Sequence, residues 1–119
     1  MTEPRFFATR HDGPALVIEV LQPVGSLADD SVLHELDRIL AEIGTSAAQA
    51  VIVDFHRIAY FGSSLLEALR VVWRHLQPLD GRIVLCNLSP VGREIIELAK
   101  FDHVWPIVDS LADAQQKLA

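Results

Sequence analysis

The sequence is short of several things, and each shortage excludes a class of protein. It has one cysteine, Cys86, which rules out an internal disulfide and any zinc site built from several cysteines. It has no basic cluster, and 16 acidic residues against 10 basic ones give a formal net charge of −6. This balance argues against nucleic acid or an anionic membrane surface as a direct partner, and it favours a basic protein surface.

Long hydrophobic runs are also missing. Residues 15–21 form one of the longest, but Glu19 interrupts it and it is far too short to span a bilayer. The first five residues do not show the basic and then apolar layout of a signal peptide, so we expect a cytoplasmic protein. With 119 residues, half of them hydrophobic and 22% charged, the sequence predicts a single globular domain over residues 1–119.

Motifs for metal or cofactor binding are absent. The five histidines are scattered, with no i, i+4 pair beside an acidic residue, so we expect no metal site. No strand is followed by a glycine-rich phosphate loop or a dinucleotide fingerprint, so we expect no cofactor. Cys86 lies within an apolar run, and we expect it to be buried packing material.

Asp54 closes an apolar strand, as the phosphate-accepting aspartate of a receiver domain does. That chemistry needs a magnesium ion held by further carboxylates, whereas the first two predicted strands end in Thr9 and Leu21. We therefore expect Asp54 to cap its loop or to be solvated.

Hydrophobic periodicity predicts the elements of the first half of the chain. Two strands, at residues 5–9 and 16–21, are separated by turn chemistry at Asp12-Gly13-Pro14. A helix with its apolar stripe over residues 32–43 follows, with Ser31 as its cap, and residues 45–49 form a linker.

The second half of the chain alternates between strands and helices. The predicted elements are a buried strand at 51–53, a helix from 65 to 76, a strand at 83–86, a helix after Ser89-Pro90 with an apolar face of Val91, Ile95, Ile96 and Leu98, an edge strand at 103–108, and a last helix capped by Asp109 or Ser110. This order predicts an α/β fold, with about four helices packed on a mixed sheet of four to five strands. The opening strand pair forms an antiparallel edge, and right-handed crossovers join parallel neighbours after residue 50.

The stretch from Ala50 to Leu76 holds the candidate site. A loop after the buried strand leads to Gly62-Ser63-Ser64, and Leu65 opens the apolar periodicity of the next helix. The two serines are therefore predicted at a helix N-terminus, which has unpaired N–H groups and a partial positive charge. A hydroxyl there can cap the helix or carry a phosphate.

With these residues in view, the chain resembles the STAS domain family, the anti-sigma-factor antagonists. Three stretches carry the resemblance: 51–64, which is similar to the strand and aspartate-serine-serine-glycine loop of the family; 81–90, similar to the next strand and helix cap; and 97–111, similar to the end of the domain. The first half fits through its order of elements and through Gly25-Ser26-Leu27. The resemblance implies a single STAS-like domain.

The resemblance also implies a regulatory switch in signal transduction and transcription regulation, and not an enzyme. In the family, a partner that is both an anti-sigma factor and a serine kinase phosphorylates the first serine of the loop, and a phosphatase resets it. The matching residue is Ser63, with Ser64 as the second choice. The implied partner-binding residues are Gly62, Ser63, Ser64, Leu65 and Leu66.

Two residues of the loop depart from the family pattern. Gly62 stands where the family has its aspartate, which removes a capping acceptor and a contact to a partner. Leu65 stands where the family has glycine, and it either adds bulk near a partner or joins the core stripe with Leu69. Ala28 also replaces an acidic residue that many members carry.

Several alternatives stay open at this point. Ser63 and Ser64 could serve only as N-caps of the helix. The chain could be a STAS-like accessory subunit of a larger assembly, such as a transporter ATPase complex, without any phosphorylation. A small hydrolase that uses Ser63 or Ser64 is a further alternative, although the G-x-S-x-G turn is incomplete. Apolar surface near Trp73 or Trp105 could support a homodimer.

Overall fold

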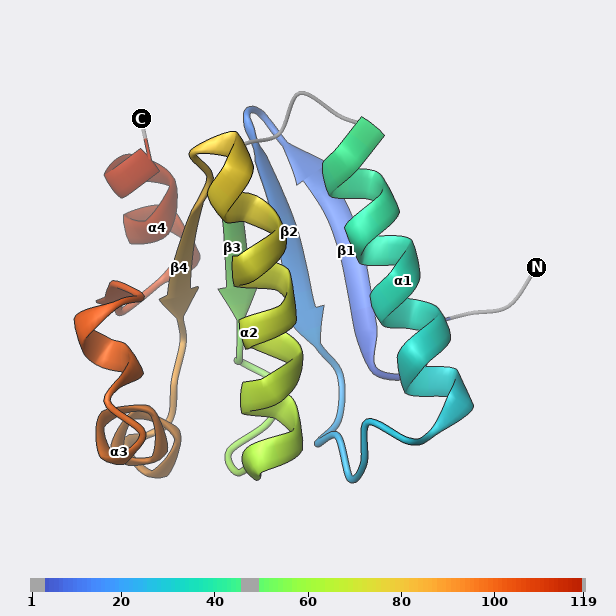
Figure 1. Ribbon diagram of the computed structural model, residues 1–119. Coiled ribbons are helices and arrows are strands. Elements are labelled where there is room, and N and C mark those ends of the chain that lie inside the picture. The colour runs from blue at the N-terminus through green and yellow to red at the C-terminus, as the bar shows by residue number, and fades with distance from the viewer. Residues whose placement is uncertain (1–3, 46–49, 119) are drawn as a thin grey trace.

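The computed structural model describes residues 4–45 and 50–118. The elements in chain order are β1 (Phe7–Asp12), β2 (Ala15–Val20), α1 (Asp30–Thr45), β3 (Ala50–Asp54), α2 (Ser63–Leu76), a 3-10 turn η1 (Gln77–Leu79), β4 (Arg82–Cys86), α3 (Pro90–Leu98), a second turn η2 (Phe101–His103), β5 (Ile107–Val108) and α4 (Leu111–Leu118). This is the predicted order of strands and helices, and Figure 1 shows the helices packed against one twisted sheet. Among the described helices, none is both long and apolar enough to cross a membrane.

The five strands lie in the order in which they occur in the chain. β1 pairs with β2 in antiparallel fashion, and β2, β3, β4 and β5 are parallel neighbours. Gly13 makes the tight turn between β1 and β2 with a φ of +59°, which glycine adopts at little steric cost. The mixed sheet predicted from the sequence is confirmed, at the upper end of the predicted strand number.

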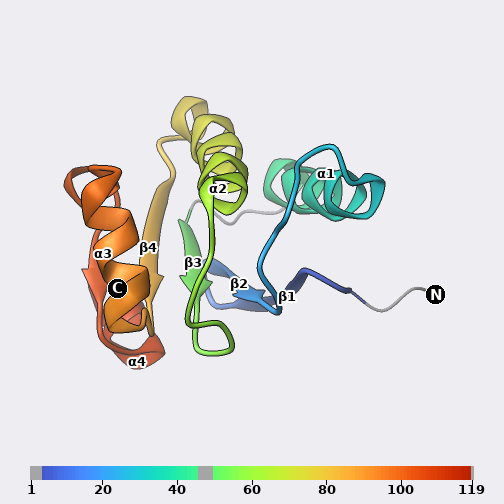
Figure 2. The ribbon, with the colours of Figure 1, turned by 90° about the horizontal axis from the view of Figure 1, so that it is seen from below.

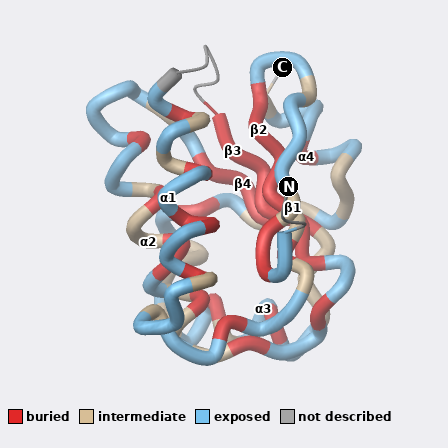
Figure 3. The backbone as a smooth tube through the Cα atoms, turned by 90° about the vertical axis from the view of Figure 1, so that its right-hand side faces the viewer, coloured by how far each residue is buried: buried red, intermediate tan, exposed pale blue. Residues whose placement is uncertain are grey.

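The two faces of the sheet carry cores of unequal size. The larger core contains side chains of α1, α2 and α3 together with Trp105, and the smaller one is covered by α4 through Ala114. Figure 2 shows α1 and α2 on one side of the sheet and α4 on the other. All five residues of β3 are buried, because helices cover both faces of this central strand, as Figure 3 shows. Cys86 is buried as predicted, in the smaller core.

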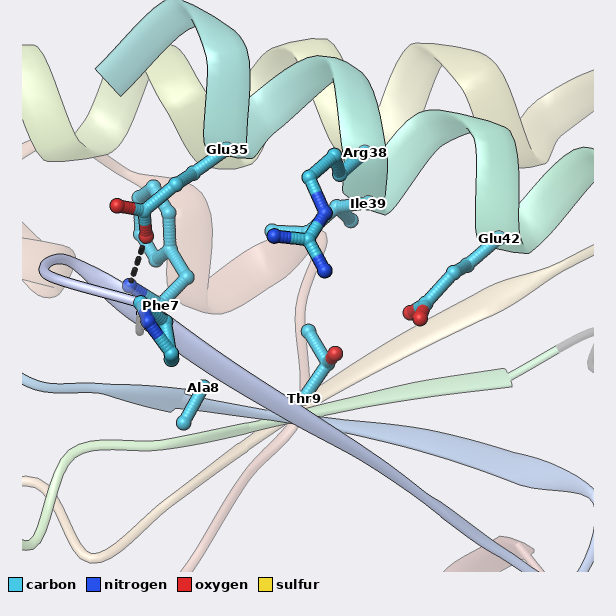
Figure 4. Close-up of a pocket in the computed structure, with 8 residues that line it drawn as sticks. Phe7, Ala8, Thr9, Glu35, Arg38, Ile39 and Glu42 are labelled. Carbon is cyan, nitrogen blue, oxygen red and sulfur yellow. Dashed lines mark hydrogen bonds between the residues drawn. The ribbon is translucent and has the colours of Figure 1, made fainter. Parts of the chain in front are cut away.

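Glu35 ties α1 to the first strand of the sheet. Its carboxylate is buried and accepts hydrogen bonds from the backbone N–H groups of Arg5, Phe6 and Phe7 at 2.9 to 3.0 Å. Figure 4 shows Glu35 reaching from α1 to Phe7, beside a hollow of about 190 Å³. A buried carboxylate that accepts from three N–H donors holds the start of β1 in place against α1.

Both boundaries of α1 and two strands differ from the prediction. The first strand, predicted at residues 5–9, is β1 at Phe7–Asp12, because its pairing with β2 continues to Asp12 beside Ala15. α1 begins at Asp30, and Asp29 caps it instead of Ser31, because its carboxylate accepts from the Ser31 N–H at 2.8 Å. The predicted linker begins one residue too early, since Thr45 is the last residue of α1, and residues 46–49 lie outside the described part. The edge strand is limited to Ile107–Val108, because residues 101–105 fold into a turn of their own.

The predicted apolar face of α3 is only partly buried. Ile96 is fully buried, but Leu98 is 76% exposed and Val91 is 49% exposed. Trp105 is also buried, stacked on Phe101 with ring centroids 4.4 Å apart, so it provides no surface for a homodimer. The neighbouring Val104 is 43% exposed, so a homodimer through apolar surface near Trp105 stays a prediction.

Candidate functional site

Loops from three parallel strands meet at one edge of the sheet. The carboxyl ends of β2, β3 and β4 lie at the lower edge in Figure 1, next to the first turns of α2 and α3. Residues 55–62 connect β3 to α2 there and end at the serine pair. In open α/β sheets this edge is the usual place for binding sites.

Asp54 holds the beginning of the β3–α2 loop. One carboxylate oxygen accepts from the His56 N–H and from the Asn87 amide, both at 3.0 Å, and the other lies 2.9 Å from the His56 ring Nδ1. Asn87 follows β4 with a φ of +59°, a left-handed conformation that asparagine tolerates better than most residues. Asp54 thus caps its loop, as one of the two predicted outcomes had it, and it also joins the loop to the end of the next strand.

The environment of Asp54 favours its charged form. Burial alone would raise its pKa, but the hydrogen bonds from Asn87 and His56, together with the nearby His56 charge, outweigh burial and leave the pKa below its ordinary value. The same burial raises the pKa of the Cys86 thiol to about 12, with help from the Asp54 charge. Asp54 is therefore a structural anion, and Cys86 is not a reactive thiolate.

The far end of the loop is held from α3. The Ser89 hydroxyl donates to the Ala59 carbonyl at 2.6 Å and accepts from the Gly92 N–H at 2.9 Å. Phe55 and Phe61 are both buried, with ring centroids 5.2 Å apart, and fill the space beneath the loop. The loop is therefore anchored at both ends before it reaches the serine pair.

The serine pair stands at the first two positions of α2. Gly62 is the N-cap, with extended backbone at φ −111° and ψ −166°, and no side chain caps the helix. Ser63 is exposed, and the Ser64 hydroxyl donates to the Gly25 carbonyl of the β2–α1 loop at 3.4 Å. The alternative in which the serines serve only as N-caps is wrong, because the extended conformation that capping needs falls one residue earlier.

Gly62 stands where the sequence comparison above led us to expect an aspartate, and this difference has the predicted effect on helix capping. Gly62 offers no side-chain acceptor, so the N–H groups of the first turn of α2 have no side-chain cap. That turn also contains no acidic residue. An anion attached near Ser63 would therefore meet free N–H groups and the positive end of the helix dipole.

The two leucines after the serines differ in exposure. Leu65 is fully buried with Leu69 in the larger core, which settles it as part of the core stripe, so its side chain cannot reach a partner. Leu66 is half-buried and packs at the margin of the same core. The accessible surface of this site is thus made by Gly62, Ser63, Ser64 and the outer side of Leu66.

The register of β2 and β3 brings together three ionisable side chains that the sequence did not place side by side. Glu19 of β2 lies beside Asp54 of β3, and their carboxylates lie within 4.8 Å of each other and of the His56 ring. The Arg57 guanidinium binds Glu19, and N–H donors occupy Asp54, so hydrogen bonds already balance these charges. The sequence predicted the two strands, at residues 16–21 and 51–53, but not that they would be neighbours.

The serine hydroxyls do not show the geometry of a nucleophile. Within residues 4–45 and 50–118, no hydrogen bond joins Ser63 or Ser64 to a histidine or a carboxylate, and Ser64 bonds instead to a backbone carbonyl. A serine nucleophile needs a base within hydrogen-bond reach. The arrangement therefore gives no support to the hydrolase alternative.

Comparison with known proteins identifies the family. The STAS domain model matches residues 7–114, which is nearly the whole chain. The chain belongs to the STAS domain family. The resemblance drawn from the loop and strand motifs is thereby confirmed.

A sequence relative and two solved structures place this STAS domain among similar proteins. BtrV of Bordetella bronchiseptica, provisionally assigned as an anti-sigma factor antagonist, is 30% identical over 95 residues, which cover 80% of this chain and 79% of BtrV. The anti-sigma factor antagonist SpoIIAA, in its unphosphorylated form, has the same fold with a TM-score of 0.77 at 23% identity, covering 94% of this chain and 95% of SpoIIAA. A STAS domain protein from Planctomyces limnophilus gives a TM-score of 0.75 at 24% identity, with 92% and 95% covered. These relatives are named as regulators and not as enzymes.

Proposed function

We propose that this STAS domain is an anti-sigma-factor-antagonist-like switch, which binds a regulatory protein of the anti-sigma factor and serine kinase type through the surface at Gly62, Ser63, Ser64 and Leu66. The observation that carries the proposal is the exposed Ser63 hydroxyl at the first position of α2, on a loop anchored at both ends. The similarity to BtrV and SpoIIAA supports the same role.

Phosphorylation of Ser63 would switch the affinity without changing the fold. A phosphate adds about −1.5 to −2 charges near pH 7. The free N–H groups and the dipole of α2 stabilise those charges in the isolated domain. A partner pressed onto Ser63 would have to desolvate them, so the phosphorylated form would bind more weakly.

One observation favours a second role for the same surface. Gly62 provides neither the cap nor the carboxylate contact of the family loop. A STAS-like accessory subunit of an assembly such as a transporter ATPase complex would need the docking surface and no phosphorylation. The two roles share the surface and differ only in the chemistry at Ser63.

Intact-mass measurement of the protein purified from its own cells, before and after phosphatase treatment, separates these roles. The switch predicts a loss of about 80 Da, the mass of one phosphoryl group, on phosphatase treatment. This loss should be absent in Ser63→Ala and retained in Ser64→Ala, which is the matched control. A co-purified kinase, whose binding weakens at least about tenfold with Ser63→Asp, completes the case. An unmodified Ser63 on protein that co-purifies with an ATPase would instead establish the subunit role.

A further inference from the structure

β1 is the outermost strand of the sheet, and its outer edge presents free backbone groups. Among the described strands it pairs with β2 alone. The Phe6 carbonyl accepts from the Leu21 N–H at 2.8 Å, so this carbonyl faces β2. The N–H of Phe7 turns away from β2 and donates to Glu35 at 3.0 Å. Because backbone groups alternate in direction along a strand, the N–H and C=O of Thr9 turn outward as those of Phe7 do.

A hollow of about 190 Å³ lies between this edge and α1. It is lined by Pro4, Phe7, Ala8, Thr9, Glu35, Arg38, Ile39 and Glu42. Figure 4 shows Arg38 and Glu42 extending from α1 toward β1, with Thr9 on the strand below them. The hollow is smaller than the roughly 300–1,000 Å³ of sites for drug-sized ligands, so it suits a ligand of only a few heavy atoms.

Two of the three ionisable side chains that line the hollow lack a partner. Glu35 already accepts three backbone N–H groups. Arg38 is exposed and forms no ion pair with another described residue. Glu42 forms none either, and one of its carboxylate oxygens is buried without a hydrogen-bond partner in the part of the chain that the structure describes. These two residues are four positions apart with the cation first, which is the weaker order for a helical ion pair.

The unpartnered groups are sorted by charge along the hollow. Figure 4 shows α1 and β1 passing it in the same direction. The Thr9 N–H precedes the Thr9 C=O along the strand, as Arg38 precedes Glu42 along the helix. The donors therefore lie toward one end of the hollow and the acceptors toward the other. A ligand that satisfies both ends carries an anionic and a cationic group a short distance apart.

We propose that this hollow binds a free α-amino acid with a small side chain. The carboxylate of the ligand accepts from the Arg38 guanidinium and the Thr9 N–H, and its ammonium group donates to the Glu42 carboxylate and the Thr9 carbonyl. Charge-assisted hydrogen bonds at both groups provide the affinity. A simple anion would use Arg38 and leave Glu42 without a partner, and a simple cation would do the reverse.

This site is separate from the proposed switch. The hollow is formed by β1 and α1, whereas Ser63 begins α2. None of the contacts assigned to the ligand involves the surface at Gly62, Ser63, Ser64 and Leu66. A failure of the amino-acid site would leave the proposed function untouched, and the reverse also holds.

Titration of the isotopically labelled chain with L-alanine, followed by NMR, tests the proposal. We expect saturable shifts of the Thr9 amide, with a dissociation constant in the millimolar range or below. N-acetyl-alanine keeps the carboxylate and lacks the ammonium group, and alanine amide keeps the ammonium group and lacks the carboxylate. Each should bind about tenfold more weakly than alanine, or worse, because one charged group of the site loses its partner.

Matched variants assign each charge of the ligand to a residue. Arg38→Gln and Glu42→Gln should each weaken alanine binding about tenfold or more, whereas Arg74→Gln and Glu94→Gln, on exposed surface of α2 and α3, should leave it unchanged. In Glu42→Gln the preference for alanine over N-acetyl-alanine should disappear, and in Arg38→Gln the preference over alanine amide. A merely structural role for either residue would not produce this pairing.

Any of four results would overturn the proposal. These are no binding of alanine at millimolar concentration, equal binding of the three ligands to the unchanged chain, binding that leaves the Thr9 amide unshifted, and binding that neither Arg38→Gln nor Glu42→Gln weakens. An unaltered NMR spectrum of each free variant confirms its fold. Ser63→Asp serves as a further control, because alanine should bind to it as to the unchanged chain.

Discussion

Helices α2 and α3 begin in the same way and use their serines differently. Each follows a parallel strand, and each has a serine at its start. Ser89 is the N-cap of α3, and both bonding capacities of its hydroxyl are used, toward Gly92 and Ala59. Ser63 lies one position inside α2, exposed, while Gly62 takes the cap position without a side chain.

The comparison shows how position decides whether a hydroxyl is structural or available. A serine at the cap is oriented inward by the N–H group that it accepts from. A serine one residue later has helical backbone and a side chain that faces solvent. The hydroxyl of Ser63 is therefore free for chemistry that Ser89 could not undergo without loss of its helix cap.

The largest expected effect comes from the residue that joins the two helix starts. Asp54→Ala removes the acceptor for Asn87, which precedes α3, and for His56, which precedes α2. We expect a loss of about 3 kcal/mol in the free energy of unfolding, because three half-buried hydrogen bonds lose their buried, charged acceptor. Urea denaturation at neutral pH measures it. A loss below about 1 kcal/mol would show that the two loops are held independently.

The same residue makes a signed prediction for pH. Because the pKa of Asp54 is lowered in the folded state, its charge stabilises the fold fully above the ordinary aspartate pKa of about 3.9. This contribution is lost as the pH falls through the lower folded pKa. The difference in stability between the unchanged chain and Asp54→Asn should therefore be constant near neutrality and shrink below about pH 4. A difference that grows in acid would have the opposite sign and refute the assignment.

The direct test of the comparison is the pair Ser89→Ala and Ser63→Ala. Ser89→Ala should destabilise by about 1.5 kcal/mol, since the cap of α3 and the bond to Ala59 are both lost. Ser63→Ala should change the free energy of unfolding by less than about 0.5 kcal/mol. Thermal and urea unfolding of both variants would suffice. Equal losses would mean that Ser63 is also structural.

The smallest expected effect is a gain. Gly62→Asp restores a capping acceptor at φ −111°, and a Cβ there meets nothing within 4 Å. We expect about 0.5 kcal/mol of added stability, from the cap and from a less flexible unfolded chain. Gly62→Ala is the matched control, because it shares the second contribution and lacks the first. If alanine stabilised as much as aspartate, the cap would be irrelevant.

Local chemistry was readable in advance wherever it depends on neighbouring residues. The Ser89-Pro90 pair predicted the cap and the first position of α3, and the Gly62-Ser63-Ser64 stretch predicted where α2 begins. The alternation of strand and helix gave the parallel sheet. The Ser31 cap was misplaced because the helix begins two residues earlier than predicted, and the Asp29 carboxylate accepts from the N–H of Ser31 itself.

The sequence by itself determined the order of the elements, the burial of Cys86 and the position of Ser63 at a helix start, because periodicity and turn chemistry act over a few residues. Only the tertiary structure decided that Glu19 would lie beside Asp54, that Leu65 would be buried in the core, and that β5 would pair with only the last two residues of β4. Those outcomes depend on strand register and on which helix covers which face. Both are fixed by contacts between residues far apart in the chain, which no local pattern encodes.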